Sequence, residues 1–245
     1  MEICLAMKCC DLTLATPEEN LACDEVLLDL CEGSTLEGVL RFWKAPRYFV
    51  VVGYANRAAL EVNQEFCRRH DIPILRRCSG GGAVLQGPGC LNYSLILPIA
   101  HSPALAGIAE TNDFILGRHQ NTLQELLRAP VEKQGHTDLA IGGLKFSGNA
   151  QRRRKDALLF HGSFLLHADI AFMEKALPLP SHQPDYRVNR SHTDFLLNLK
   201  IPGHLLKSAL AKTWEATDAL LDLPLGEIVR LSRERYQQDS WNFKF

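Results

Sequence analysis

The sequence predicts an α+β fold built on an antiparallel or mixed sheet. Strand-like segments dominate the first two-thirds of the chain and helix-like segments dominate its end, which disfavours a doubly wound fold. Short glycine-containing connections between the strand-like segments are typical of hairpins. At 245 residues, 46% of them hydrophobic, the chain can build a large core without metal or disulfide support. We expect a single domain over residues 1–245.

A helix that begins after Thr16 is the best-marked element. Thr16 can cap this helix, Pro17 suits its first turn, and Glu19 stands where a capping box needs an acid. Apolar residues then recur at helical spacing from Leu21, and the pattern ends near Gly33. Further helices are predicted over residues 60–69, 104–128, 171–177, 203–221 and 225–238.

The strand-like segments are rich in β-branched and aromatic residues and are bounded by glycine or proline. They are predicted at residues 40–42, 48–52, 72–75, 83–85, 91–97, 131–133, 138–141, 145–147 and 157–166. A loop rich in proline and histidine is predicted over residues 178–192.

The charges of the chain are nearly balanced. It carries 27 basic and 28 acidic side chains, for a formal net charge of −1 and a pI of about 6.7. A nucleic acid or membrane held by bulk electrostatics requires a basic field, so we expect neither as a partner. No stretch approaches the roughly 18 consecutive apolar residues of a membrane span.

All eight cysteines lie in the first 90 residues. The segment Met1–Cys10 lacks the long apolar run of a signal peptide, so we expect reduced cysteines and a cytoplasmic location. No pair has the C-x-x-C spacing of a zinc site. The cysteines are Cys4, Cys9, Cys10, Cys23, Cys31, Cys67, Cys78 and Cys90.

The strongest local motif is RRCSGGGAV, at residues 76–84. Its three glycines permit positive φ, and consecutive backbone amides in such a loop form an anion-binding nest. Arg77 can offer a bidentate fork to a phosphate or carboxylate. The alternative is a flexible hairpin loop with solvated arginines. The motif is not a P-loop, because no G-K-[ST] follows it.

A second motif, DLAIGGLKFSGNAQ, spans residues 138–151. Gly142 and Gly143 indicate a two-residue hairpin turn, which places Lys145 at the start of the returning strand and Asp138 on the partner strand. Beside a glycine-lined pocket such a lysine acts as a directed cation; an exposed strand lysine is the alternative. Glycine and asparagine weaken strands, so residues 147–151 indicate close backbone approach or ligand contact.

Four segments, taken in order, resemble the lipoate-protein ligases of the biotin/lipoate protein ligase superfamily: RRCSGGGAV, GPGCLNYS, DLAIGGLKFSGNAQ and HGSFLL. Weaker similarity lies in NLACDE at 20–25, GYANR at 53–57, EVN at 61–63 and YRVNRS at 186–191. The resemblance covers about residues 15–200. It implies a class II synthetase-like fold, in which a mixed or antiparallel sheet is flanked by helices.

The resemblance also implies a two-step reaction. The carboxylate of lipoate attacks the α-phosphorus of ATP with the help of Mg²⁺, giving lipoyl-AMP and pyrophosphate. The ε-amine of a lysine on an acceptor protein, a lipoyl domain or an H-protein-like domain, then attacks the mixed anhydride and leaves an amide and AMP. Negative charge develops on oxygen in both steps, where a fixed cation and oriented amides stabilise it.

By this resemblance Lys145 is the catalytic cation, in contact with the acyl carbonyl and the α-phosphate. Asp138 either orients Lys145 or lies near Mg²⁺, with a strand-end salt bridge as the alternative. Asn92 and Asn149 serve ligand or backbone hydrogen bonds. His161 contacts the substrate or is a satisfied core residue. The residues expected to hold the nucleotide are Arg77, Gly80, Gly81, Gly82, Ala83, Val84 and Leu85.

Two features leave alternatives open. The basic run Arg152–Lys155 is either a solvated turn or a docking site for an acidic acceptor domain. Two-domain members of the family carry an extra C-terminal domain that helps adenylation, and this sequence ends at Trp241–Phe245. Either a separate accessory protein supplies that domain, or the chain acts without it, or it only transfers preformed lipoyl-AMP. We expect a monomer.

Acyltransferases of the same superfamily are the competing interpretation. They move octanoyl or lipoyl groups without ATP, through a thioester on a cysteine downstream of the glycine-rich segment, and this chain has no cysteine after Cys90. We therefore favour an ATP-dependent ligase. A biotin ligase is disfavoured because RRCSGGGAV is not a biotin-type loop. A non-catalytic lipoate- or nucleotide-binding protein is disfavoured because Arg77 and Lys145 are both present.

Overall fold

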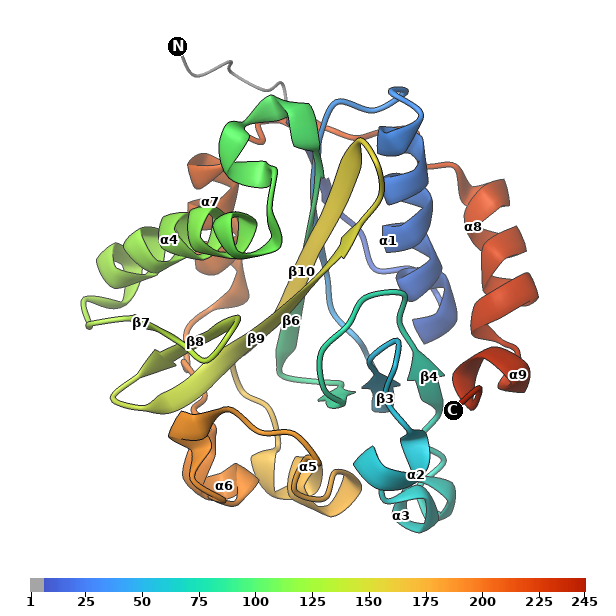
Figure 1. Cartoon of the computed structure of the whole chain (residues 1–245), viewed down its shortest axis with the longest axis vertical. Helices are drawn as coiled ribbons and strands as arrows, with labels where there is room; N and C mark the ends of the chain where they lie inside the picture. Colours follow the sequence, from blue (N-terminus) through green and yellow to red (C-terminus); the bar gives the residue numbers. More distant parts are fainter. Residues whose placement is uncertain (1–6) are drawn as a thin grey trace.

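The computed structural model describes residues 7–245; Cys4 and most of the segment expected to lack a signal peptide lie outside that range. A mixed sheet runs through the centre of the molecule (Figure 1). The strand of this sheet that comes first in the sequence is parallel to both of its neighbours, and all the other strand pairs are antiparallel. From edge to edge the strands are β11 (Asp218–Ala219), β1 (Lys8–Asp11), β2 (Val39–Trp43), β6 (Cys90–Pro98), β10 (Ala157–Leu165), β9 (Leu144–Arg153), β8 (Asp138–Ile141) and β7 (Glu132–Gln134).

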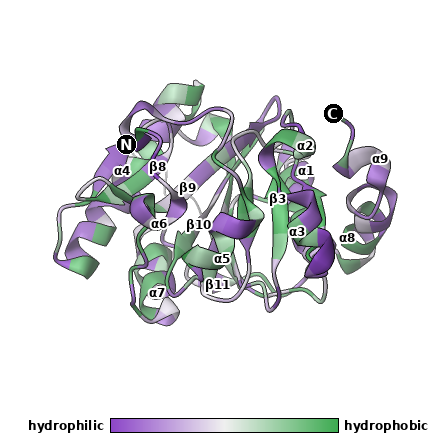
Figure 2. Ribbon diagram, turned by 90° about the horizontal axis from the view of Figure 1, so that it is seen from below, coloured by the Kyte–Doolittle hydropathy of each residue, from purple (hydrophilic) through white to green (hydrophobic). Residues whose placement is uncertain are grey.

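A smaller sheet of three strands lies beside the main one (Figure 1). Its central strand is β3 (Phe49–Val52), parallel to β4 (Ile74–Arg76) and antiparallel to β5 (Val84–Gln86). Every residue of β3 is buried, and the strand is strongly hydrophobic in Figure 2. A continuous apolar run of this kind is typical of a strand covered on both faces.

Helices cover both faces of the main sheet. On one face α1 (Pro17–Glu32) and α8 (Leu225–Leu231) pack over the side chains of Val39 and Trp43. On the other face α4 (Ile108–Leu127) and α7 (Gly203–Thr213) pack over Leu40 and Phe42. Because successive side chains of a strand point to opposite faces, β2 contributes to both cores. A mixed sheet covered by helices on both faces confirms the predicted α+β class.

Short helices lie at the lower side of Figure 1. Three of them, α2 (Ala58–Glu61), α3 (Gln64–Arg69) and α5 (Ile170–Ala176), share a core with the smaller sheet. The fourth, α6 (His192–Phe195), packs against α5 and β9. The chain then ends in a π-helical turn (Ser232–Tyr236) and α9 (Asp239–Asn242), whose Trp241 and Asn242 hold the Arg76 side chain and backbone. Further single 3-10 turns occur at Ile99–His101, Pro103–Leu105 and Asp185–Arg187.

Several predicted elements have different limits in the structure. The capping box at Thr16 and Glu19 is present. The predicted helix 203–221 is wrong beyond Thr213, because residues 218–219 leave the helix to pair with β1 at the sheet edge. The predicted strand 145–147 is part of a ten-residue strand, since Gly148 and Asn149 are held in the sheet by pairing with β10. Strand β1 was not predicted at all. Within residues 7–245, none of the helices has the length and apolar character needed to cross a membrane.

Candidate functional site

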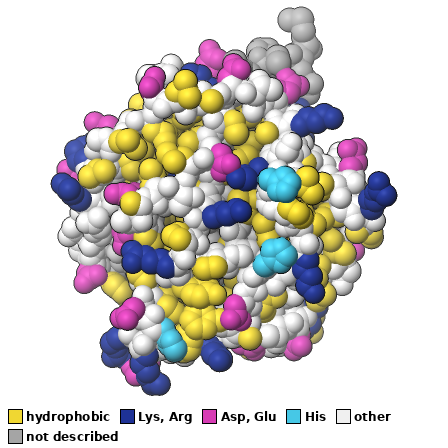
Figure 3. Space-filling model, turned by 180° about the vertical axis from the view of Figure 1, so that it is seen from behind, with side chains coloured by type: hydrophobic (Ala, Val, Ile, Leu, Met, Phe, Trp, Pro, Cys, Tyr) yellow, Lys and Arg dark blue, Asp and Glu magenta, His cyan; other side chains and the backbone are white. Residues whose placement is uncertain are grey.

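A cavity of about 880 Å³ lies where the α1 face of the main sheet meets the smaller sheet. It is bounded by the glycine loop before β5, the β8–β9 hairpin and the loop over residues 180–187. Its walls include the apolar side chains of Leu21, Val51 and Phe195. Figure 3 shows lysine, arginine and histidine side chains gathered among hydrophobic ones near the middle of one face. A largely apolar cavity with a few convergent polar groups is typical of a small-molecule site.

A lateral row of paired residues crosses four strands beneath the cavity. Paired residues of antiparallel strands place their side chains on the same face, about 5 Å apart. From β9 to β2 the row consists of Gly148, Ser163, Asn92 and Trp43, each paired with the next and each lining the cavity. The cavity therefore extends sideways across the sheet, with Gly148 at one end and Trp43 at the other.

Lys145 stands at the Gly148 end of this row. Gly142 and Gly143 form the predicted hairpin turn, with φ values of 56° and 73° that favour glycine. The strand register then shifts, because between two successive residue pairs β9 contains one residue more than β8. Such a bulge redirects a side chain. Lys145 Nζ lies so close to Gly148 that a Cβ atom added there would come within 2.8 Å of it.

Asp138 holds Lys145 in this position. Its Oδ1 lies 2.7 Å from Lys145 Nζ, and its Oδ2 accepts a hydrogen bond of 2.8 Å from the Tyr186 hydroxyl. Burial and the neighbouring Asp138 carboxylate raise the pKa of Tyr186, so this phenol stays protonated and donates. Asp138 thus fixes a lysine cation at the cavity wall.

The same contacts test Asp138 as a Mg²⁺ ligand. Mg²⁺ in proteins is bound through one or two carboxylates together with substrate phosphates. Both oxygens of Asp138 already bond protein groups, and no three His, Cys, Asp or Glu side chains of residues 7–245 cluster as a metal site. Asp138 therefore fits the role of orienting Lys145 better than that of a Mg²⁺ ligand.

The glycine loop is held from within by Arg77. Its guanidinium donates to the carbonyls of Gly80 and Gly82 and to the hydroxyl of Ser79. Burial lowers the pKa of Arg77 to about 10, which leaves it protonated near neutral pH. Gly81 has a φ of 86°, and its carbonyl lies where a side chain at Gly53 would stand. Arg77 lines the cavity, but most of its donors shape the loop.

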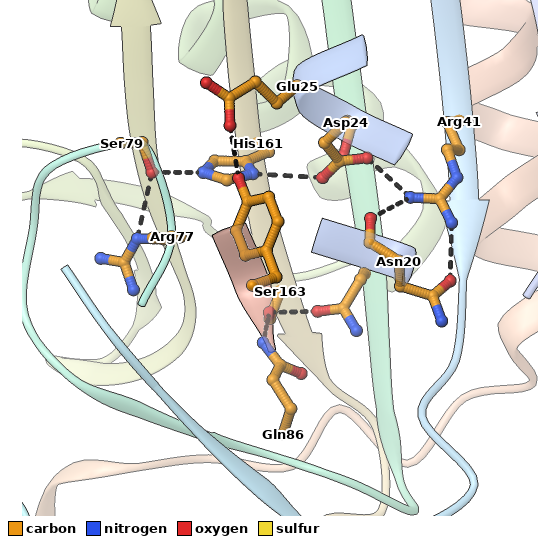
Figure 4. A network of polar contacts seen from close by, with 12 residues as sticks. Asn20, Asp24, Glu25, Arg41, Arg77, Ser79, Gln86, His161 and Ser163 are labelled. Carbon is orange, nitrogen blue, oxygen red and sulfur yellow. Dashed lines mark hydrogen bonds and ion pairs between the residues drawn. The ribbon is translucent and has the colours of Figure 1, made fainter. Parts of the chain in front are cut away.

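A buried relay connects this loop to α1 (Figure 4). Asp24 lies 2.7 Å from Arg41 Nη1 and 3.4 Å from His161 Nδ1. Burial alone would raise the pKa of Asp24, but Arg41 and the bonds from His161 and Ser94 lower it. The Nδ1 atom of His161 faces the Asp24 carboxylate, and its Nε2 atom lies 2.6 Å from the Ser79 hydroxyl oxygen. Asp24 thus reaches the glycine loop through His161 and Ser79.

Most of the predicted site residues come together around the cavity. Those that line it are Arg77, Gly81, Gly82, Ala83, Val84, Asp138, Lys145, Asn149 and His161. Gly80 and Leu85 are not among the lining residues: Gly80 turns its carbonyl to Arg77, and Leu85 packs into the core under the smaller sheet. Strand alternation explains Leu85, because its neighbours Val84 and Gln86 face the cavity.

Sequence reasoning missed Asp24, Gln86, Ser163 and Tyr186. Strand alternation could have identified Gln86 as a cavity residue, because it lies two residues after Val84. Asp24 and Ser163 can be recognised as cavity residues only from the packing of strands and helices. Asn149 lines the cavity, yet its amide is occupied: Nδ2 donates to the Thr137 carbonyl and Oδ1 accepts from Tyr93. It supports the β8–β9 hairpin from within.

The basic run does not form one patch. Arg153 turns to the α4 face and donates to the carbonyls of Leu105 and Ala106. Arg154 turns to α1, where it bonds Asp29 at 2.8 Å. Alternation along β9 separates these side chains, so residues 152–155 do not present a common docking surface.

No cysteine within residues 7–245 lines the cavity. Burial is the main cause that raises the pKa of both Cys78 and Cys90 to about 12. A thiol with such a pKa is almost entirely protonated at neutral pH, whereas the thiolate is the nucleophile. These cysteines act as small buried hydrophobic residues.

Comparison with known proteins places this chain in a family. A family model described as the lipoyl protein ligase A/B catalytic domain matches residues 16–201. The octanoyltransferase LipM of Halalkalibacterium halodurans is 24% identical, over 93% of this chain and 95% of its own. Lipoate-protein ligase 1 of Staphylococcus aureus is 26% identical, over 94% of this chain and 71% of its own.

Two solved structures share the fold. One is a bi-partite lipoate protein ligase of Thermoplasma acidophilum, described with its E2 lipoyl domain; its TM-score is 0.77 at 24% identity, over 97% of this chain and 96% of its own. The other, a lipoate-protein ligase A bound with ATP, has the same TM-score and identity, over 97% and 99% of the chains. The class II synthetase-like sheet predicted from the sequence is thereby confirmed. On the extent of the family match, the chain belongs to the lipoyl protein ligase A/B catalytic-domain family.

Proposed function

We propose that this enzyme is an ATP-dependent lipoate-protein ligase. The main support for this proposal is the position of Lys145, which Asp138 holds at the wall of the cavity. No cysteine of the described residues lines this cavity. A ligase needs a fixed cation and oriented backbone groups, and no protein nucleophile. A thioester-forming transferase needs an accessible thiolate.

In the first step, the substrate carboxylate attacks the α-phosphorus of ATP and pyrophosphate leaves. Lys145 Nζ holds the attacking carboxylate and stabilises the negative oxygens that develop on phosphorus. The loop from Gly81 to Val84 presents its backbone to the nucleotide, and Arg77 keeps that loop in shape. Positioning and charge stabilisation account for the acceleration.

In the second step, the acceptor lysine amine attacks the acyl carbonyl of the mixed anhydride. Lys145 stabilises the tetrahedral oxyanion, AMP leaves, and the amine loses its proton to water. The Thermoplasma acidophilum ligase is described together with its E2 lipoyl domain, and this supports a lipoyl domain as the acceptor. The bi-partite make-up of that ligase likewise supports a separate accessory protein as a further partner.

The alternative is an ATP-independent octanoyl or lipoyl transferase, which the similarity to LipM favours. The cysteine chemistry opposes it, because Cys78 and Cys90 are buried and protonated. Transfer of preformed lipoyl-AMP would use the same Lys145 and differs only in skipping the first step.

The test is lipoate-dependent release of pyrophosphate from ATP, with and without a lipoyl-domain acceptor. We expect release with the wild-type chain and at least a hundredfold loss in Lys145→Ala. Lys133→Ala is the matched control, since Lys133 is also a strand lysine bonded to an aspartate, Asp113, but lies outside the cavity.

Each other outcome selects an alternative. Acyl transfer from a loaded carrier without ATP would establish the transferase. Modification of the acceptor by added lipoyl-AMP, with no pyrophosphate release even when an accessory protein is supplied, would establish the transfer-only enzyme.

A further inference from the structure

Two buried amides at the floor of the cavity have unsatisfied hydrogen-bonding groups. Asn92 and Gln86 are 3% and 6% exposed, and the Ser163 hydroxyl lies between them. Ser163 donates to Asn92 Oδ1 and accepts from Gln86 Nε2, as Figure 4 shows for Gln86. Asn92 Nδ2 and Gln86 Oε1 then have no partner among the described residues. Buried polar groups are nearly always hydrogen-bonded, so a group from outside the protein, a water or a ligand, is needed to meet this pair.

The conclusion does not depend on which way the amides are turned. If both were flipped, Ser163 would accept from Asn92 and donate to Gln86. The free atoms would then be Asn92 Oδ1, an acceptor, and Gln86 Nε2, a donor. Either orientation leaves one donor and one acceptor without a described partner, on two residues that line the cavity.

The pair lies away from the reactive end. Lys145 Nζ lies over Gly148, and Asn92 stands two strands further along the lateral row, at about 10 Å by strand spacing. Trp43, one strand beyond, has no partner within residues 7–245 for its indole N–H. The walls nearby are apolar, with Leu21 from α1 and Val51 from β3. An acyl chain whose carboxylate meets Lys145 would extend along this row toward Asn92, Gln86 and Trp43.

We propose, resting on the proposed function, that Asn92 and Gln86 select an acyl substrate whose tail carries hydrogen-bonding heteroatoms. Lipoate ends in a disulfide ring, and its sulfur atoms are weak acceptors for the Asn92 and Trp43 N–H groups. The reduced dithiol adds S–H donors for Gln86 Oε1. Octanoate, with the same carbon chain and no sulfur, would leave every one of these groups unsatisfied.

This selection follows from the cost of leaving buried polar groups without partners. A site built to hydrogen-bond its substrate rejects the analogue that lacks the polar group, whereas an apolar pocket hardly distinguishes the two. The pair therefore sets a preference for lipoate over octanoate.

The test is calorimetric binding of three acids to the intact protein: lipoate, octanoate and 8-hydroxyoctanoate, whose terminal hydroxyl both donates and accepts. We expect lipoate to bind about fivefold more tightly than octanoate, because one net hydrogen bond is worth about that factor. We expect 8-hydroxyoctanoate also to bind more tightly than octanoate, for the same reason. In Asn92→Leu and Gln86→Leu both advantages should fall, while octanoate binds as well as before or better.

The matched control is Gln151→Leu, the same kind of change on the opposite face of the sheet, where Gln151 bonds Asn112 of α4. It should leave all three affinities unchanged. Equal binding of lipoate and octanoate by the wild type, or a preference that survives both variants, overturns the selection. If one variant loses all binding, the affinities of the other variant test the proposed selection. If both variants lose all binding, the ratios of the three wild-type affinities test it.

The outcome is separable from that of the proposed function. Lipoate-dependent pyrophosphate release together with equal binding of lipoate and octanoate would leave the ligase standing and overturn only the selection. Selective binding without that release, even when an accessory protein is supplied, would overturn the ligase alone.

Discussion

The ammonium group of Lys145 lies over Gly148, where a Cβ atom would come within 2.8 Å of Nζ and 2.9 Å of Cε. Gly148→Ala must therefore push Lys145 away from its place beside Asp138. We expect at least a tenfold loss of lipoate-dependent pyrophosphate release, with a melting temperature within a few degrees of wild type. Steady-state kinetics and thermal melting measure the two effects.

Gly117→Ala is the control for this substitution. Gly117 lies inside α4 with nothing within 4 Å of an added Cβ. Alanine there should stabilise the fold by about 0.5–1 kcal/mol and leave activity unchanged. Full activity in Gly148→Ala would show that the close approach of Lys145 to Gly148 has no catalytic role.

The second prediction concerns the buried ion pair of Asp24 and Arg41. The Arg41 side chain is fully buried and lies 2.7 Å from Asp24. Arg41→Met leaves a buried carboxylate without its cation, and we expect a loss of about 3–5 kcal/mol in the free energy of unfolding. Adding Asp24→Asn removes the uncompensated charge and should restore part of that loss. Urea unfolding measures both.

The exposed pair of Arg230 and Glu227 provides the comparison, because both side chains are more than half exposed. Arg230→Met should leave the unfolding midpoint nearly unchanged. A double variant that is no more stable than Arg41→Met would contradict the charge argument.

The third prediction is a pH dependence of stability set by His119. This side chain is fully buried, its Nε2 accepts from Trp214 at 2.9 Å, and burial lowers its pKa to about 3. The unfolded chain binds a proton at about pH 6.5 and the folded chain does not, so stability falls as pH falls below 6.5. The slope from this group is up to about 1.4 kcal/mol per pH unit.

His119→Gln keeps an acceptor for Trp214 and removes the titration, so its stability should depend less steeply on pH between 6.5 and 4. Part of the slope will remain because burial also lowers the pKa of His192 to about 4. His204→Gln, at an exposed position of α7, should leave the wild-type slope unchanged. Equal slopes in wild type and His119→Gln would refute the assignment.

The fourth prediction separates ligase from transferase by thiol chemistry. Iodoacetamide at pH 7.5 should leave lipoate-dependent ligation intact, because burial keeps Cys78 and Cys90 protonated and covered. Mass spectrometry of residues 7–245 should find the label first on Cys9, the most exposed of the cysteines described there. As a control, alkylation of the denatured protein should label every thiol, which shows that each can react once it is exposed. Loss of activity in step with labelling of one cysteine would favour the transferase.

Local features of the site could be predicted from the sequence. The capping box of Thr16 and Glu19, the turn at Gly142 and Gly143, and the pairing of Lys145 with Asp138 each depend on residues a few positions apart. Backbone preferences and hydrogen bonding over such short separations are encoded in the residues themselves. The glycine loop was likewise expected, although the dominant use of Arg77 as an internal brace was not.

The tertiary structure alone decided the rest. Asp24 meets His161 across 137 positions of sequence, and Gly148, Ser163, Asn92 and Trp43 form one row only because β9, β10, β6 and β2 pair in one register. The edge strand β11 exists only because β1 lies beside it. A shift of one residue in any pairing would turn these side chains to the opposite face. The sequence by itself determined the α+β class and the hairpin that brings Lys145 beside Asp138. Strand register, a property of distant segments packed together, decided which side chains line the cavity.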